Sequence, residues 1–325
     1  MGVLILLYVI TFTYNYIYHK LLLDKLLSLY YEKFEFDLGQ AIFYLFYGIS
    51  ILIGSVLSNK INRKRLLQAW IYSGIIINIL LMTLHSRSNL YLLLSLTAFS
   101  IGFGLPSCFS YLVESTSFEN RGRGSSIVQF LIFVSVFGLI AAATVLDLSL
   151  NQVIMLGIII RVATLIPLHM DSFDRVIQAS QPWGKVLGSK QTLLFLIPWV
   201  LISLNNGVLI FFDHSLPSSP EFEGVLTQGS YIMFIGISVF GLISGFMADR
   251  SGRKQPLILG AMALGISYAL VGISTTPFNL MLMMILSGAG WGFVTVILQW
   301  VVFGDLAPKG SEEKYYVLAL VVYPV

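Results

Sequence analysis

The sequence has few charged residues and almost no cysteine. Charged side chains make up 11% of its 325 residues and hydrophobic ones 57%, with a mean hydropathy of +0.85. Soluble domains carry about 25% charged residues, so this composition excludes an ordinary soluble domain. Cys108 is the single cysteine, which excludes an internal disulfide and any cysteine-based metal cluster. The composition predicts a membrane protein.

Enzyme motifs are also missing from the sequence. It contains no Ser/His/Asp arrangement, no His-Glu-x-x-His helix, no Walker loop and no dinucleotide fingerprint. The four histidines lie at the ends of apolar segments: His19, His85, His169 and His214. The clustered glycines at 102–104 and 288–292 lie inside apolar segments, where close helix packing explains them better than phosphate binding. We therefore expect neither an enzyme nor a cofactor or metal site.

Signals for export and lipidation are absent from the N-terminus. Met1 leads almost directly into an apolar segment, without a basic region or a small-residue cleavage site, so we expect no removable signal peptide. Leu6 stands where a myristoylation signal needs Ser or Thr.

Long apolar segments dominate what the chain does contain. Crossing the hydrocarbon layer takes about 20 apolar residues in a helix. Ten segments of this kind are present: 3–19, 40–58, 67–84, 90–113, 125–146, 152–168, 192–212, 227–248, 256–273 and 278–303. An eleventh starts near Tyr315 and reaches the end of the sequence. The pattern predicts an all-helical, multi-pass membrane protein.

Basic residues are distributed unevenly between the two sides of these segments. One side carries Lys60, Arg63, Lys64, Arg65, Arg121, Arg123, Arg175, Lys185, Lys190, Arg250, Arg253, Lys254, Lys309 and Lys314. The other carries only Lys20, Lys25, Lys33 and Arg87. The positive-inside rule then predicts that the side with more Lys and Arg faces the cytoplasm, and that the N-terminus lies on that side. We expect the protein in the plasma membrane. The net charge of +3 reflects this topology, and we expect no nucleic-acid partner.

The most specific motif is Gly245-Phe-Met-Ala-Asp-Arg-Ser-Gly-Arg-Lys254, a basic turn between two apolar segments. It resembles the loop signature of the major facilitator superfamily: Gly, three residues, Asp-Arg, any residue, Gly-Arg and then Arg or Lys. Every position matches. The resemblance implies two six-helix bundles that rock around a central site, and a gating role for Gly245, Asp249, Arg250, Gly252, Arg253 and Lys254.

A weaker copy of this signature begins at Gly54, with Ser58, Asn59 and Ile61 where Asp, Arg and Gly are expected. One offset relates three pairs of positions, because 245 − 54, 305 − 114 and 206 − 15 all equal 191. This internal repeat predicts bundles at 1–168 and 192–325, joined by a cytoplasmic linker at 169–191. The last helix or two of the second bundle would be missing.

The segment Tyr111-Leu-Val-Glu114, followed by Arg121-Gly-Arg-Gly124 and Gln129, is similar to the fourth-to-fifth helix region of superfamily members, the sugar porters above all. That likeness implies that Glu114 and Arg121 pair with the basic residues around Arg63. It also implies that Asp305 pairs with Arg250, Arg253 or Lys254. Acids at helix C-terminal ends oppose the macrodipole, so cations are expected beside them in any case.

Polar residues inside the apolar segments are the candidates for a substrate site. Polar side chains are costly in hydrocarbon unless they face partners or water, and the family's first, seventh and tenth helices line its cavity. We therefore expect substrate contacts from Asn15, Asn206, Trp291 and Gln299. Helix packing is the alternative explanation for such residues, and it is favoured for the Ser and Thr positions. An amide and aromatic lining favours a neutral or weakly charged solute such as a sugar.

Three ionisable residues need separate interpretation. Arg161 lies mid-segment, where a charge is a functional candidate, but an arginine on the inner half can snorkel to the cytoplasm, and we favour snorkelling. His19 fits a solvated helix extension, with Lys20 and Asp24 as a local ion pair. Asp213 is equally consistent with a surface residue and with a carboxylate that couples a proton.

Together these patterns predict secondary active or facilitative transport of a small polar solute by alternating access, with a coupling proton left open. The alternative is a non-transporting fragment, or a transporter-like scaffold or sensor in the lipid bilayer.

Overall fold

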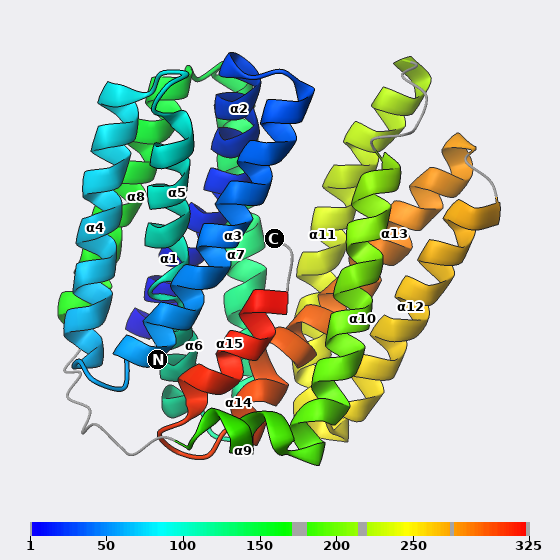
Figure 1. The fold of residues 1–325 in the computed structure, drawn as a ribbon. Helices are drawn as coiled ribbons and strands as arrows, with labels where there is room; N and C mark the ends of the chain where they lie inside the picture. Colours follow the sequence, from blue (N-terminus) through cyan, green and yellow to red (C-terminus); the bar gives the residue numbers. More distant parts are fainter. Residues whose placement is uncertain (1, 171–180, 214–219, 274–275, 323–325) are drawn as a thin grey trace.

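The computed structural model describes residues 2–170, 181–213, 220–273 and 276–322. Residues 2–170, which we call the first half, form a group of helices on the left of Figure 1. Residues 181–322 are the second half. Helix α1 continues through a π-helical turn, Tyr18–Leu23, into α2. The helices of this half are α1 (Gly2–Ile17), α2 (Asp24–Tyr30), α3 (Lys33–Leu57), α4 (Arg63–Leu84), α5 (Leu90–Gly102), α6 (Leu105–Ser115), α7 (Arg121–Val145) and α8 (Leu150–Met170).

The second half forms a separate group of long helices on the right of Figure 1, with the short α15 lying between the groups near one end. Helix α13 continues through a π-helical segment, Thr295–Val302, into α14. The helices of this half are α9 (Trp183–Gly188), α10 (Lys190–Asp213), α11 (Pro220–Ser251), α12 (Lys254–Ile273), α13 (Pro277–Val294), α14 (Phe303–Leu306) and α15 (Glu312–Val322).

Seven helices of described residues are long and apolar enough to cross a membrane: Lys33–Leu57, Arg63–Leu84, Leu90–Ser115, Arg121–Val145, Leu150–Met170, Gln228–Ser251 and Pro277–Leu306. Many large apolar side chains on their outer faces are exposed, for example Ile76 and Leu92. Such a surface is stable against lipid and would aggregate in water. The chain is an all-helical polytopic membrane protein, as its composition predicts.

Local signals set several helix boundaries. The Asn62 side chain caps α4 by accepting hydrogen bonds from the backbone N–H groups of Lys64 at 2.9 Å and Arg65 at 3.4 Å. The fourth predicted segment is interrupted between α5 and α6 at Gly104, where a Cβ would overlap the ring of Trp70.

Helices from the two halves meet along the centre of the molecule. Helix α11 packs along α7, and α15 packs against α3 and α6. The predicted boundaries of the two bundles, and the superposition of Gly54 on Gly245 and of Glu114 on Asp305, stay predictions. Part of the predicted linker, residues 171–180, lies outside the described residues.

Candidate functional site

Charged side chains from both halves gather at the end of the molecule that carries the loops after α3, α6 and α11. We call this end the basic end, and we call the group of ion-paired residues there the basic-end network. Its members are Arg63, Glu114, Arg121, Arg123, Asp249, Arg253, Asp305 and Glu313. Four of these residues come from each half.

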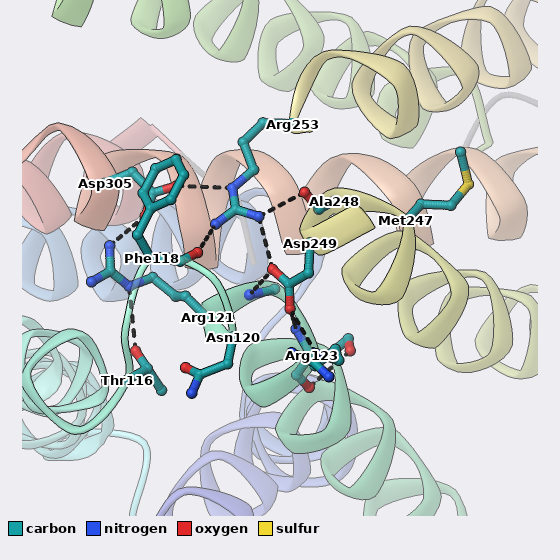
Figure 2. Close-up of polar contacts among 12 residues, drawn as sticks. Thr116, Phe118, Asn120, Arg121, Arg123, Met247, Ala248, Asp249, Arg253 and Asp305 are labelled. Carbon is teal, nitrogen blue, oxygen red and sulfur yellow. Dashed lines mark hydrogen bonds and ion pairs between the residues drawn. The ribbon is translucent and has the colours of Figure 1, made fainter. Parts of the chain in front are cut away.

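Asp249, at the C-terminal end of α11, caps the first turn of α7 in the other half (Figure 2). Its carboxylate accepts hydrogen bonds from the backbone N–H groups of Gly122 at 3.0 Å and Arg123 at 2.8 Å. The Arg123 Nε also donates to it at 3.2 Å. A carboxylate at a helix N-terminus satisfies free N–H groups and is favoured by the helix dipole. The cap joins the two halves.

Arg253 links Asp249 to Asp305, as Figure 2 shows. Its Nη1 donates to Asp249 Oδ1 at 2.8 Å, and its Nε donates to Asp305 Oδ2 at 2.9 Å. Across the interface it donates to the Phe118 carbonyl at 2.5 Å and lies 4.7 Å from the centre of that ring. Gly252 has φ of +86°, a left-handed conformation that glycine adopts without strain. This turn brings Arg253 back toward Asp249.

Arg121, in the first turn of α7, forms an ion pair with Asp305 of α14 across the interface. Asp305 is therefore held by one arginine from each half. The expectation that Arg121 pairs near Arg63 is wrong, because the first turn of α7 lies against the ends of α11 and α14 instead. Of the three basic residues considered for Asp305, Arg253 makes the contact, while Arg250 and Lys254 are exposed.

Arg63 is also shared between the two halves, as Asp305 is. It pairs with Glu114 of its own half at 2.5 Å and with Glu313 of α15, and the side chains of Arg63 and Glu313 are each only 2% exposed. Sequence analysis missed Glu313. A signal exists, because 312 − 121 equals 191, so the repeat aligns the acidic pair at 312–313 with the basic start of α7.

Two glycines allow the halves to touch beside this network. A Cβ at Gly245 would overlap the carbonyl oxygen of Gly122 and the side chain of Ser126. A Cβ at Gly122 would lie 2.5 Å from Asp249 Oδ1 and 2.6 Å from the Gly245 carbonyl oxygen. Any side chain at either position would separate α7 from α11 and weaken the Asp249 cap.

A polar contact between the halves lies farther inside. The amide of Gln129 on α7 donates to Thr295 Oγ1 at 3.0 Å, and that hydroxyl lies 3.2 Å from Gln129 Oε1. Thr295 opens the π-helical segment, and segments of this kind occur frequently at functional sites. The sequence signal for this contact is the family-like run from Arg121 to Gln129, which does not by itself mark Gln129 as a site residue.

The predicted substrate residues lie in different surroundings. Trp291 packs edge-to-face on Trp199, with ring centres 6.4 Å apart. Gln299 lies in the π-helical segment and is 7% exposed, while Asn206 on α10 is half-buried. Asn15 instead lines a hollow made only by helices of the first half. Their substrate roles stay predictions.

Arg161 does not snorkel. It is 4% exposed, its Nη1 donates to the Trp70 carbonyl at 3.3 Å, and its guanidinium carbon lies 4.1 Å from the centre of the Tyr14 ring. The position of Arg161 in its own segment does not predict this burial, because the space for the guanidinium is left by a different helix, α4. The side chains of His19 and Asp213 lie outside the described residues.

Glu119 adds negative charge beside the network in the loop before α7. Hydrogen bonds from the Ser117 side chain and from its own backbone N–H lower its pKa, and the positive charge of Arg253 lowers it further. Glu119 therefore stays ionised at neutral pH. Among the described residues, no three His, Cys, Asp or Glu side chains come together as a metal site.

Comparisons with known proteins agree with this architecture. Residues 3–323 match the Major Facilitator Superfamily, whereas a search of curated proteins found no match. The fold is similar to a bacterial homologue of the iron transporter ferroportin in its outward-facing state, with TM-score 0.75, 16% identity, and coverage of 99% of this chain and 88% of that one. It is also similar to a proton:xylose symporter, with TM-score 0.73, 16% identity, and coverage of 98% of this chain and 84% of that one. A human organic anion transporter matches with TM-score 0.73, 13% identity, and coverage of 99% of this chain and 89% of that one. At these identities the likeness is one of fold.

Proposed function

Because the chain belongs to the major facilitator superfamily, we propose that it moves a small polar solute across a membrane by alternating access. Membership of this family makes the chain a membrane transport protein. The kind of solute and the mechanism are our proposal. The two helix groups would rock against each other around a site at their interface. The transport is either facilitative or secondary active, and the assay below separates the two.

The basic-end network is the observation that carries this proposal. Among the described residues, every ion pair that joins the two halves lies at this end, whereas the exposed Arg87–Glu35 pair at the opposite end joins residues of one half. Contacts that exist in only one conformation can bias an equilibrium between two conformations. The network therefore suits a latch that closes one side while the other is open.

We place the basic end in the cytoplasm of a plasma-membrane protein, with the N-terminus on the same side. The uneven distribution of Lys and Arg supports this orientation. The structure would then correspond to the conformation closed toward the cytoplasm. One fold relative was solved in an outward-facing state, which supports the same assignment.

The proposed solute is neutral or weakly charged, such as a sugar. Gln129 and Thr295 meet across the interface between the halves, Gln299 lies in the π-helical segment that Thr295 opens, and Trp291 packs on Trp199 within the second half. Few precisely placed polar groups on an apolar lining are typical of small-molecule sites. One fold relative is a proton:xylose symporter, and another is a nucleoside transporter. Sugars and nucleosides are therefore the first compounds to test.

Uptake into proteoliposomes tests the proposal. We expect the purified full chain to accumulate at least one radiolabelled monosaccharide or nucleoside above empty liposomes. The Asp305→Asn variant should reduce the rate about tenfold or more, because a latch energy of about 1.4 kcal/mol corresponds to a factor of ten. Arg87→Gln removes an exposed pair and serves as the control.

Applying a pH gradient distinguishes coupled from facilitative transport. Saturable binding without uptake would contradict the proposal and favour a sensor or scaffold.

A further inference from the structure

A second polar site lies inside the first half, away from the interface between the halves. Its centre is Arg161, near the middle of α8, and its walls come from α1, α4 and α8. The residues that line it are Thr11, Tyr14, Asn15, Trp70, Ile71, Arg161 and Thr164, around about 10 Å3 of free space.

The neighbouring helices are shaped to hold the guanidinium of Arg161. A Cβ at Gly74 of α4 would overlap this group, so only glycine leaves room for it. The Tyr14 ring lies against it at 4.1 Å, and the Trp70 carbonyl accepts a hydrogen bond at 3.3 Å. The side chain is fixed in place by contacts from two other helices, and it points toward the hollow.

The charge of Arg161 has no acidic partner in the part of the chain that the structure describes. Ion pairs of described residues involve other arginines, and the contacts of Arg161 are a carbonyl, a ring and, at 3.5 Å, the Ser100 hydroxyl. Buried charges are normally paired, because removing an ion from water is costly. A guanidinium within a membrane-spanning segment is therefore an attractive point for a negative charge.

Hydrogen-bond donors beside Arg161 are unused as well. The Arg161 Nε, both amide atoms of Asn15 and the Thr11 hydroxyl are buried without a partner among the described protein groups. Asn15 and Thr11 are 7% and 5% exposed. The free guanidinium N–H and the two neighbouring donors, from Asn15 and Thr11, suit an anion, which accepts hydrogen bonds and donates none.

The size of the hollow limits the ligand. Its free space is about 10 Å3, roughly what one water molecule needs, so only a single small ion fits. We propose that it binds one small monovalent anion, a halide or a short carboxylate, between Arg161, Asn15 and Thr11. The anion neutralises the buried guanidinium and ties α1 to α8. This inference does not depend on the proposed transport activity.

Thermal unfolding of the purified full chain in different sodium salts tests the inference. Wild type in gluconate buffer, with chloride, bromide or formate added at constant ionic strength, should show a saturable rise in Tm of about 3 °C or more. Gluconate is too large for the hollow and provides the baseline. A stronger effect of formate than of the halides would identify a carboxylate as the preferred anion.

Variants separate binding from a purely structural role of the arginine. Arg161→Gln should abolish the salt-specific rise in Tm. Asn15→Leu and Thr11→Val should each raise the anion concentration that gives half of the rise at least threefold. Arg87→Gln, which changes an exposed arginine, should keep the full rise. If Arg161→Gln does not fold, the Asn15 and Thr11 variants decide the question. Identical Tm values of wild type in chloride, formate and gluconate would overturn the inference, as would an unchanged rise in the three site variants.

Discussion

Replacing Gly245 with alanine is expected to hold the two halves apart at the basic end. The new Cβ would overlap the Gly122 carbonyl oxygen, which is backbone and cannot rotate away. Overpacking of this kind costs about 1–3 kcal/mol, and a difference of about 1–3 kcal/mol between two conformations changes their ratio about 5- to 150-fold. The Asp249 cap on α7 would be lost from most molecules.

Reactivity of an introduced cysteine measures this effect. Val113 lies beside Gly304 where α6 meets α14, and it is 8% exposed, so Val113→Cys should react slowly with a water-soluble maleimide while the end is closed. The native Cys108 is fully buried and contributes little background. Gly245→Ala should speed the reaction at least about fivefold. Gly138→Ala, on α7 with open space around it, is the matched control. Equal rates in all three proteins would show that the glycine contact does not govern closure.

Replacing Arg63 with glutamine is expected to destabilise the protein strongly. The substitution removes the Arg63 guanidinium from Glu313, whose side chain is 2% exposed. Removing one partner of a buried pair typically costs about 3–5 kcal/mol. The free energy of unfolding in detergent, measured by titration with a denaturing surfactant, should fall by a comparable amount.

An exposed pair of the same chemistry gives the control for Arg63. Arg87 and Glu35 are 66% and 37% exposed, and losing an exposed pair costs only about 0–1 kcal/mol. Arg87→Gln should therefore change stability little. The double variant Arg63→Gln with Glu313→Gln should recover part of the loss, because it also removes the charge of the buried carboxylate. A double variant no more stable than Arg63→Gln alone would mean that the pair is not what stabilises this region.

The sequence predicts the helices well because apolar segments long enough to cross a membrane have few alternatives. Helix starts at the basic end are less predictable. Helix α7 begins at Arg121, four positions before the expected 125, because Asp249 from the other half satisfies the N–H groups of Gly122 and Arg123. No residue near α7 in the sequence carries that information.

The sites inside the bundle show a similar limit. A spacing of four residues puts Thr11 and Asn15 on one face of α1, where both line the same hollow. It cannot say which helices cover that face, and α4 and α8 do so instead of the second half. The buried position of Arg161 depends on Gly74 and Tyr14, which lie on other helices. The loop signature, by contrast, places Asp249 and Arg253 in contact through its own turn.

The central claim is that the basic end opens and closes, and a distance measurement tests it most directly. Arg65 and Lys254 are exposed at the starts of α4 and α12, one in each half. Spin labels on Arg65→Cys and Lys254→Cys, in a Cys108→Ser background reconstituted into lipid bilayers, report their separation by pulsed electron paramagnetic resonance. We expect two distance populations, with the longer one increasing when Asp305→Asn removes the carboxylate shared by Arg121 and Arg253. A single distance that Asp305→Asn leaves unchanged would contradict the account.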